Sequence, residues 1–315
     1  MHSYSVGIIG LGKIAHDQHL PAIAGDAGFT LAAITSQRGL TAGGVPTFRT
    51  PAEMYAAIPD LQTVAVCTPP QVRHATAREA LAAGKHVMLE KPPAMTMAEL
   101  ADLTAFAKSQ GRVLFATWHS RFNAAVEAAR QRLAGKTVTR MTITWREDVR
   151  HWHPGQTWIW QAGGFGVFDP GINALSIATR IMPTPLFVTG ADLEFPENCE
   201  APIAARLTFA SLAPGALTAD FDWRQTGPQT WDIDIETAEG DRMRLESGGS
   251  KLFVDGALSV EAPSTEYEQI YERFHALLEA GESEVDDAPL RLVADAFLVG
   301  RRIATDPFIE RLPQS

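Results

Sequence analysis

The chain has 315 residues, about twice the length of a typical domain, so we expect two domains, each with its own core. Hydrophobic residues make up 45% and charged residues 20%, which excludes a mainly disordered chain. The 27 Lys and Arg against 37 Asp and Glu give a net charge of −10, which repels nucleic acid and anionic membranes. We therefore expect a small-molecule substrate, and neither nucleic acid nor membrane as a partner.

The cysteine content and the amino terminus indicate the compartment. Two cysteines, Cys67 and Cys199, are too few for a disulfide framework. The apolar run at residues 6–11 is far shorter than the roughly 20 residues of a membrane span, and no basic segment precedes it. We expect a cytoplasmic protein that is neither exported nor membrane-bound.

The first 120 residues alternate short β-branched runs with alanine-rich helical stretches. This alternation is typical of a doubly wound parallel sheet with helices on both faces. We therefore predict an α/β Rossmann domain over residues 1–120. The predicted strands lie near 5–10, 30–35, 63–67, 86–90 and 113–117, and the helices near 14–24, 51–57, 72–83 and 97–109.

Residues 121–315 follow a different pattern, in which strands succeed one another with few helices between them. Ile233 and Ile235 alternate with acidic residues, which indicates a sheet with one wet and one covered face. Two amphipathic helices follow, near 267–274 and 290–297. We predict a substrate-binding α+β domain with an open, mostly antiparallel sheet and a C-terminal helix that can pack back on the first domain. A ligand in the crevice between two domains is the default expectation.

A glycine-rich turn follows the first predicted strand. Residues 10–15 read G-L-G-K-I-A and open a helix, which matches the dinucleotide-binding pattern G-x-G-x-x-A. Glycines let the backbone turn sharply and approach a pyrophosphate, while the helix amino terminus supplies free N–H groups. The position of the motif in the first βα turn favours this function over a purely structural turn.

The end of the second strand bears on the choice between NAD and NADP. An NAD-specific site usually has an acid there that binds the ribose 2′-hydroxyl. This chain has Ser36 and Arg38 instead. Arg38 can pair with a 2′-phosphate, which favours NADP, although a solvated surface arginine is the alternative. The nicotinamide cofactor is therefore predicted to be NADP in preference to NAD.

Further motifs carry a family resemblance. G-K-H-V at 84–87 runs into E-K-P at 90–92, and G-G at 163–164 leads to Asp169. Together with the glycine-rich turn, these motifs resemble the glucose–fructose oxidoreductase / inositol dehydrogenase family over nearly the whole chain. The segments 13–22, 118–121, 152–156 and 168–173 are similar to those of family members that oxidise C1 of L-arabinose and D-galactose. The resemblance implies a Rossmann fold, hydride transfer from a sugar carbon to NAD(P), release of a lactone, and a cis Lys91–Pro92 bond.

Four residues are candidates for the chemistry. Lys91 lies at the end of the fourth strand, where its ammonium can donate to the reacting hydroxyl; a surface lysine is the alternative. Asp169 is our first choice as the general base, and the alternative is a purely structural role as a helix cap. Family members commonly have a histidine four residues after this aspartate, but this chain has Asn173, which cannot take a proton and would orient the sugar. His119 is the second candidate for the base.

Four of the seven tryptophans lie between residues 145 and 160, near Glu147 and His153. Aromatic faces pack on pyranose rings while carboxylates and imidazoles bind hydroxyls; a tryptophan-rich core is the alternative. Glu147 follows the buried parity of its strand and therefore needs a partner, which a sugar hydroxyl could be. His151 and His153 lack a third ligand at a suitable spacing, so we predict no metal.

The predicted site residues form two sets. The cofactor-binding set is Gly10, Gly12, Lys13, Ile14, Ser36, Arg38, Thr68, Pro69, Glu90 and Lys91. The substrate-binding set is Lys91, His119, Glu147, Trp152, His153, Asp169, Asn173 and Trp231, of which Lys91, His119, Asp169 and Asn173 are catalytic candidates. An inositol or glucose-type dehydrogenase and a non-catalytic NAD(P)-binding sensor are the alternatives, and both a monomer and a homo-oligomer stay open.

Overall fold

A computed structural model describes residues 3–310 of the chain. The chain divides into two compact units. The first unit comprises Met1–His119 and Thr265–Asp287, and the second comprises Ser120–Ser264 and Ala288–Ser315. The assignment of residues 1–120 to the cofactor and 121–315 to the substrate stays a prediction.

The first unit contains a six-stranded, all-parallel sheet in the order β3-β2-β1-β4-β5-β6, which confirms the predicted doubly wound fold. The two-residue strand β3 was not predicted, because it is too short to produce a pattern. The strands are β1 Tyr4–Ile9, β2 Phe29–Thr35, β3 Thr47–Phe48, β4 Thr63–Val66, β5 His86–Leu89 and β6 Leu114–Ala116.

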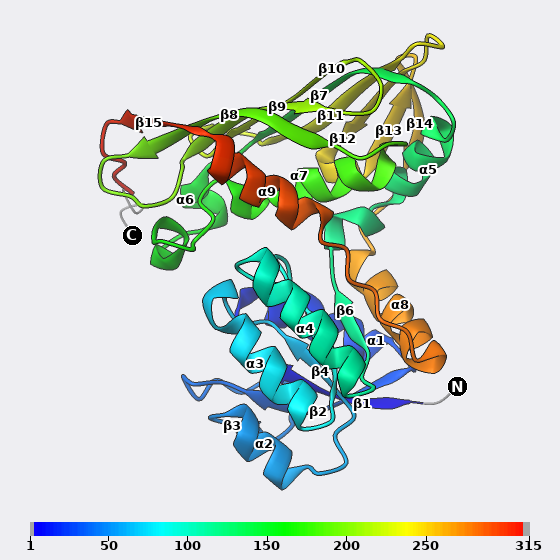
Figure 1. Cartoon of the computed structure of the whole chain (residues 1–315). Coiled ribbons are helices and arrows are strands. Elements are labelled where there is room, and N and C mark those ends of the chain that lie inside the picture. Colours follow the sequence, from blue (N-terminus) through cyan, green and yellow to red (C-terminus); the bar gives the residue numbers. More distant parts are fainter. Residues whose placement is uncertain (1–2, 311–315) are drawn as a thin grey trace. The chain divides into compact units, whose positions relative to one another are not determined.

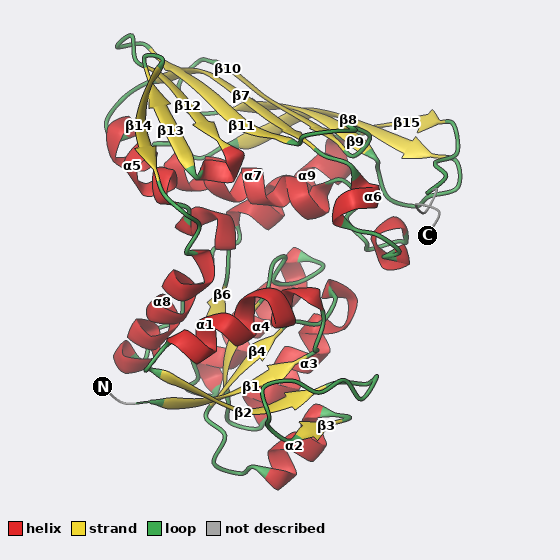
Figure 2. Ribbon diagram, turned by 180° about the vertical axis from the view of Figure 1, so that it is seen from behind, coloured by secondary structure: helices red, strands yellow, loops and turns green. Residues whose placement is uncertain are grey.

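Helices cover both faces of this sheet. Helices α3 and α4 lie together on one face, while α1 and α8 lie together on the other (Figures 1 and 2). The predicted helix at 14–24 begins with a π-helical turn, where Pro21 has no N–H to donate and crowds the carbonyl four residues earlier. The elements are η1 Ala15–His19, α1 Leu20–Gly25, α2 Pro51–Ala57, α3 Pro70–Ala82, α4 Met97–Ser109 and α8 Glu266–Ala280.

The second unit contains a nine-stranded sheet in the order β14-β13-β12-β11-β7-β10-β9-β8-β15. Neighbouring strands are antiparallel except for β7 with β10 and β8 with β15, which confirms the open, mostly antiparallel sheet. The strands are β7 Val138–Arg146, β8 Phe187–Pro196, β9 Ala204–Ala210, β10 Ala216–Asp222, β11 Thr230–Thr237, β12 Arg242–Glu246, β13 Lys251–Val254, β14 Ala257–Glu261 and β15 Arg301–Thr305.

One face of this sheet is covered by α5, α7 and α9 (Figure 2). Ile233 and Ile235 are buried, as their alternation predicts. The opposite face carries cross-strand ion pairs, including Arg244 with Asp232 at 2.8 Å. The helical elements are η2 His119–Phe122, α5 Ala124–Leu133, α6 Val149–Trp152, η3 Thr157–Trp160, α7 Phe168–Ile181, η4 Ser247–Gly249 and α9 Ala288–Val299.

Helix capping, the alternative role given to Asp169, is not what the structure shows. Asp169 does not cap α7, because the helix begins at Phe168 and the cap is Val167. The tight turn at Phe165 and Gly166, both with positive φ, starts the helix earlier than the Asp-Pro pattern indicates. A further strand, β15, follows the second of the two predicted amphipathic helices. Within residues 3–310, no helix has the length and apolar character needed to cross a bilayer.

Candidate active site

The glycine-rich turn has the geometry that a dinucleotide requires. Gly10 has a φ of 94°, and a Cβ there would lie 3.2 Å from the backbone nitrogen of Thr68. A Cβ at Gly12 would meet no heavy atom of the described residues within 4 Å, so the space beside it is open. A tight turn next to open space at the start of a helix fits the pyrophosphate of a dinucleotide.

The loop after β2 carries one arginine, and a second arginine, which follows β3, contacts this loop. Ser36 is buried, and its Oγ accepts a hydrogen bond from the Leu40 N–H at 3.1 Å. Arg38 is exposed on the same loop. Arg49, which the sequence analysis did not single out, donates from Nη1 to the Gln37 carbonyl at 2.5 Å. Arg38 therefore lies on the loop after β2, and Arg49 is hydrogen-bonded to that loop.

Arg73 on α3 joins the ends of β4 and β5. Its Nη1 donates to the Glu90 carbonyl at 2.6 Å and also to the Pro92 carbonyl, while Nη2 donates to the Thr68 carbonyl. Sequence reasoning missed this residue because a single arginine within a helix is usually solvated. Buried here, its guanidinium fixes the two loops on which Thr68 and Lys91 lie.

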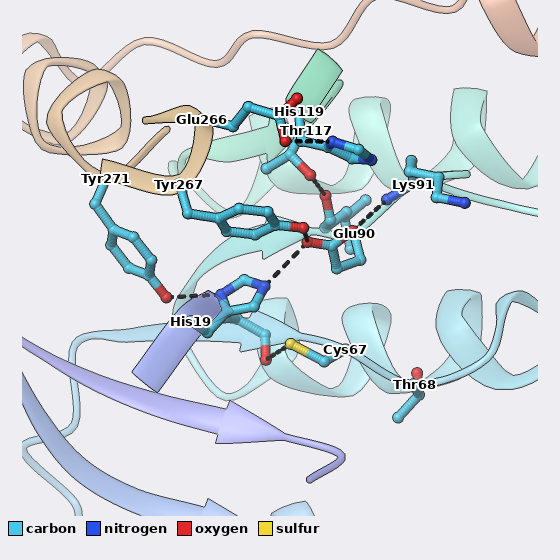
Figure 3. A network of polar contacts seen from close by, with 12 residues as sticks. His19, Cys67, Thr68, Glu90, Lys91, Thr117, His119, Glu266, Tyr267 and Tyr271 are labelled. Atoms are coloured by element: carbon cyan, nitrogen blue, oxygen red, sulfur yellow. Dashed lines mark hydrogen bonds and ion pairs between the residues drawn. The ribbon is translucent and has the colours of Figure 1, made fainter. Parts of the chain in front are cut away.

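Glu90 is at the centre of a buried polar network (Figure 3). Its Oε1 lies 3.0 Å from His19 Nε2 and accepts from the Tyr267 hydroxyl at 2.7 Å. Its Oε2 accepts from the Lys91 N–H at 3.1 Å, and His19 Nδ1 lies 2.8 Å from the Tyr271 hydroxyl. The network therefore fixes the backbone of Lys91 through the hydrogen bond that the Lys91 N–H donates to Glu90. His19 is buried within this network.

The charge of Glu90 follows from these contacts. Burial by itself raises the pKa of the carboxyl, but the hydrogen bond and charge of His19, with smaller effects of His119 and Tyr267, lower the pKa to about 2. Glu90 is therefore ionised at neutral pH. The Lys91–Pro92 bond that follows is cis, as the family resemblance implied.

His119 lies beside the same network and is paired with a carboxylate. Its Nδ1 is 2.9 Å from Glu266 Oε2. Burial lowers the pKa of His119, but the charge and hydrogen bond of Glu266 and the charge of Glu90 outweigh burial, so the pKa lies above its ordinary value. Glu266 was not predicted, because nothing in the local sequence links residues that lie 147 positions apart.

In the second unit, Glu147 is 2% exposed in its side chain and accepts hydrogen bonds from two indoles. Trp231 Nε1 donates to Oε2 at 2.9 Å, and Trp223 Nε1 lies 3.3 Å from Oε1. The sequence analysis expected a buried partner for this carboxylate and offered a sugar hydroxyl. The two indoles already satisfy part of the hydrogen-bonding capacity of the Glu147 carboxylate, which can accept further hydrogen bonds.

Trp223 was missed, although the parity of its strand indicates it. Phe221 pairs with Trp145 between the parallel strands β10 and β7, so two residues further along Trp223 reaches the level of Glu147. Trp223 is fully buried.

His153 lies between two buried carboxylates. Its Nε2 is 3.6 Å from Glu147 Oε1 and 3.8 Å from Asp169 Oδ2. Its Nδ1 is buried and has no hydrogen-bond partner among the described residues. The structure therefore brings together three of the residues that the sequence analysis assigned to the sugar.

Three indoles lie next to this group. Trp145 and Trp231 stack with ring centroids 5.6 Å apart, and Trp152 lies 5.0 Å from Trp231 at 47°. Trp145 is buried, as expected for a core tryptophan, whereas Trp152 is 36% exposed. The side chain of Trp152 is therefore partly accessible to solvent.

Helix α7 carries Asp169 and Asn173 on one face, because they are four residues apart. Asp169 is buried and Asn173 is half-buried. Gly171 lets this helix pack closely, since a Cβ there would lie 3.2 Å from the ring of Phe221 on β10. The first turn of α7 is thereby fixed against the sheet.

The first unit holds all of the predicted cofactor residues together with His119, and the second holds the other predicted sugar contacts. Within residues 3–310, no three His, Cys, Asp or Glu side chains are arranged to hold a metal ion.

A parallel sheet with this glycine turn and strand-end lysine defines a class of protein. Residues 4–117 match the family described as "Oxidoreductase family, NAD-binding Rossmann fold" (GFO/IDH/MocA), and the chain belongs to this family. It is an oxidoreductase that uses a nicotinamide cofactor.

Two relatives cover both units. The galactose 1-dehydrogenase of Pseudomonas fluorescens is 43% identical over 310 residues, which span 98% of this chain and 100% of the relative. The crystal structure of a D-galactose-1-dehydrogenase from Rhizobium etli has a TM-score of 0.93 at 54% identity, covering 98% of this chain and 99% of that one. A 3-ketoreductase from Actinomadura kijaniata, at 19% identity and a TM-score of 0.84 over 96% of this chain and 100% of that one, shares the fold alone.

Proposed function

We propose that this protein is an aldose 1-dehydrogenase that oxidises C1 of D-galactose, L-arabinose and D-fucose to the lactone. The observation that carries the proposal is the group of Glu147, His153 and Asp169 beside the partly exposed Trp152. Carboxylates and an imidazole bind sugar hydroxyls, and an aromatic face packs on the C–H face of a pyranose. The full-length likeness to two galactose 1-dehydrogenases supports the choice of sugar.

In the proposed reaction, Lys91 and Asp169 act on the same anomeric centre. The bound nicotinamide supplies the acceptor for the hydride that leaves C1. Lys91 donates a hydrogen bond to O1 and stabilises the negative charge that develops there. Asp169 accepts the O1 proton, so that the C1–H and O1–H bonds break as the C1=O bond of the lactone forms.

The remaining residues orient the sugar in this proposal. Asn173 is an amide and has no basic site at neutral pH, so it binds a hydroxyl instead of taking the proton. Glu147, His153 and Trp231 bind the hydroxyls and the ring on the other side. His119 is the second candidate for the base, and the raised pKa of its imidazole favours Asp169, because a protonated imidazole cannot accept a proton.

The three sugars share the same configuration at C2, C3 and C4 and differ in the substituent at C5. Hydroxyl recognition cannot separate them, so the space at C5 must do so. The fit of the C5 substituent in the pocket can change kcat/KM by roughly one or two orders of magnitude. All three are therefore proposed substrates, with unequal rates.

For the cofactor we propose NADP in preference to NAD. Gly10, Gly12, Lys13 and Ile14 would hold the pyrophosphate at the helix start, and Thr68 and Pro69 would border the adenosine half. Ser36 and Arg38 would bind the 2′-phosphate. Both cysteines are free thiols, which fits the cytoplasm as the site of action.

The test is a spectrophotometric screen of these three aldoses, D-glucose and an inositol with each cofactor. We expect reduction of NADP with all three proposed aldoses and production of the corresponding lactone, identified by chromatography. Turnover of inositol alone would assign another ring carbon as the reacting atom. The absence of turnover with every sugar, despite measurable binding of NADP, would assign a non-catalytic sensor.

A further inference from the structure

The segment that follows β15 packs beside the loop that carries His153. Asn198 fixes the place of this segment, because its Nδ2 donates to the Phe308 carbonyl at 2.8 Å and its Oδ1 accepts from the Phe308 N–H at 2.9 Å. Glu310 Oε1 accepts from the Gly155 N–H at 3.0 Å, two residues after His153. All of these residues belong to the second unit. The segment is therefore joined both to the turn after β8 and to the loop between α6 and η3.

Aromatic rings connect Phe308 with His153. The ring centroids of Phe308 and Trp160 lie 5.3 Å apart at 39°, and those of Trp160 and Trp223 lie 5.1 Å apart at 71°. The Trp223 ring in turn lies 5.3 Å from the His153 imidazole at 46°. Phe308 and Trp160 are half-buried, and Trp223 is fully buried. Because packed side chains leave little free space, the loss of one ring lets its neighbour move.

Packing is what holds the imidazole of His153. Its Nδ1 has no hydrogen-bond partner among residues 3–310. Its Nε2 lies 3.6 Å from Glu147 and 3.8 Å from Asp169, and both distances are too long for a hydrogen bond. Trp223 contacts this imidazole and also donates to Glu147 Oε1 at 3.3 Å. One indole therefore sets the position of both side chains.

We propose that Phe308 is a positioning residue of the sugar site, which fixes His153 through Trp160 and Trp223 in the orientation that binds a sugar hydroxyl. This inference rests on the proposed function, because it takes His153 as a sugar contact. Phe308 itself touches Trp160 and does not need to touch the sugar. A change at Phe308 should therefore alter sugar binding and the surroundings of His153, and not stability alone.

The first test follows the His153 imidazole without any sugar. Phe308→Leu removes the ring but keeps an apolar side chain, whereas Phe308→Tyr keeps the ring. We expect the Cε1–H NMR signal of His153, assigned with His153→Gln, to shift in Phe308→Leu, because the imidazole moves relative to the Trp223 ring. Phe308→Tyr should leave the signal in place. Ile309→Ala is the matched control and should also leave it in place, since Ile309 is 69% exposed on the same segment.

The second test separates KM from kcat for D-galactose. An imidazole displaced by about 1 Å loses most of its hydrogen bond to the sugar, so we expect KM to rise about tenfold in Phe308→Leu, with a smaller change in kcat. Phe308→Tyr should restore the wild-type KM, and Ile309→Ala should not change it. NADP affinity, measured by fluorescence titration, should stay at the wild-type value, because the predicted cofactor residues belong to the first unit. Urea titrations give the free energy of unfolding of each variant.

The double variant Phe308→Leu/His153→Gln decides whether the effect passes through His153. We expect its KM to match that of His153→Gln alone, because Phe308 then has no imidazole to position. A wild-type KM in Phe308→Leu, with only a lower free energy of unfolding, would leave Phe308 a purely structural role and overturn the proposal. An unmoved His153 signal, or a further rise of KM in the double variant, would also overturn it. If no aldose is oxidised at all, the proposed function fails, while the NMR signal still tests whether Phe308 positions His153.

Discussion

Trp231 donates its indole N–H to Glu147 Oε2 at 2.9 Å, and this bond joins β11 to the segment that leaves β7. The same carboxylate lies 3.3 Å from Trp223 Nε1 and 3.6 Å from His153 Nε2. A buried carboxylate with three nitrogen neighbours is held in one orientation, which is what recognition of a particular hydroxyl requires.

Glu147→Gln tests this role. The amide offers one oxygen where the carboxylate offers two, and its NH2 group faces an indole N–H that can only donate. We expect KM for D-galactose to rise between about tenfold and a hundredfold, as for the loss of hydrogen bonds to a charged group. Steady-state kinetics measure this, with Glu236→Gln on the half-exposed face of β11 as the matched control. A KM equal to that of wild type would remove Glu147 from the sugar site.

Lys91→Met retains the length and apolar stem of the side chain but removes the ammonium. Because Lys91 is proposed to stabilise charge that develops on O1, we expect kcat to fall by roughly 10²–10³-fold. NADP affinity should change much less, since the glycine turn is proposed to hold the pyrophosphate of the cofactor. Lys108→Met, on the exposed end of α4, provides the control. Substantial residual turnover in Lys91→Met would show that the ammonium is not part of the chemistry.

Asp169→Asn removes the proposed base while keeping the shape of the first turn of α7. We expect kcat to fall by roughly 10²–10⁴-fold and the acid limb of the kcat profile to disappear. The comparison variant is His119→Gln, in which KM should change more than kcat. If Asp169→Asn kept its turnover while His119→Gln lost it, the two assignments would be reversed.

The charge of Glu90 predicts a pH dependence of stability. Its pKa in the folded protein is about 2, below that of an unfolded carboxyl, so its stabilising contribution is present above about pH 4.5 and is lost as pH falls toward 2. Glu90→Gln leaves buried His19 without its charged partner, and we expect a loss of about 3–5 kcal/mol in the free energy of unfolding at pH 7. Urea titrations at several pH values measure this. The gap between wild type and variant should narrow below pH 4.5, and a gap that does not change with pH would contradict an ionised Glu90.

Arg38→Gln tests the choice of cofactor. Removing one guanidinium from a phosphate site should weaken NADP binding by about tenfold or more and leave NAD binding nearly unchanged. Fluorescence titration with both cofactors measures the two affinities, and Arg78→Gln on α3 is the control. Equal weakening for NAD and NADP would place Arg38 outside the 2′-phosphate site.

The sequence predicts the elements that depend on local pattern. Alternation in the first 120 residues and the parity of Ile233 and Ile235 lead directly to the two sheets. The start of α7 at Phe168 cannot be predicted from the Asp-Pro pattern, because the turn before it holds the bulky Phe165 at a positive φ, which no composition rule indicates. Local sequence patterns do not contain such a backbone conformation.

The residues that sequence reasoning missed act over long separations. Glu266 and Tyr267 reach His119 and Glu90 only because α8 joins the first unit. Arg73 cannot be identified as a site residue from the sequence, because its partners are backbone carbonyls, which every residue has. Trp223, in contrast, could have been found by extending the register of β10 with β7.

The most direct test of the account is a crystal structure with NADP and a slowly reacting aldose bound together. We expect Lys91 Nζ and an Asp169 carboxylate oxygen both to lie within about 3.2 Å of O1, the distance for hydrogen bonding and proton transfer. A complex in which either group lies more than roughly 5 Å from O1, with no water bridging that group to O1, would contradict the proposed chemistry.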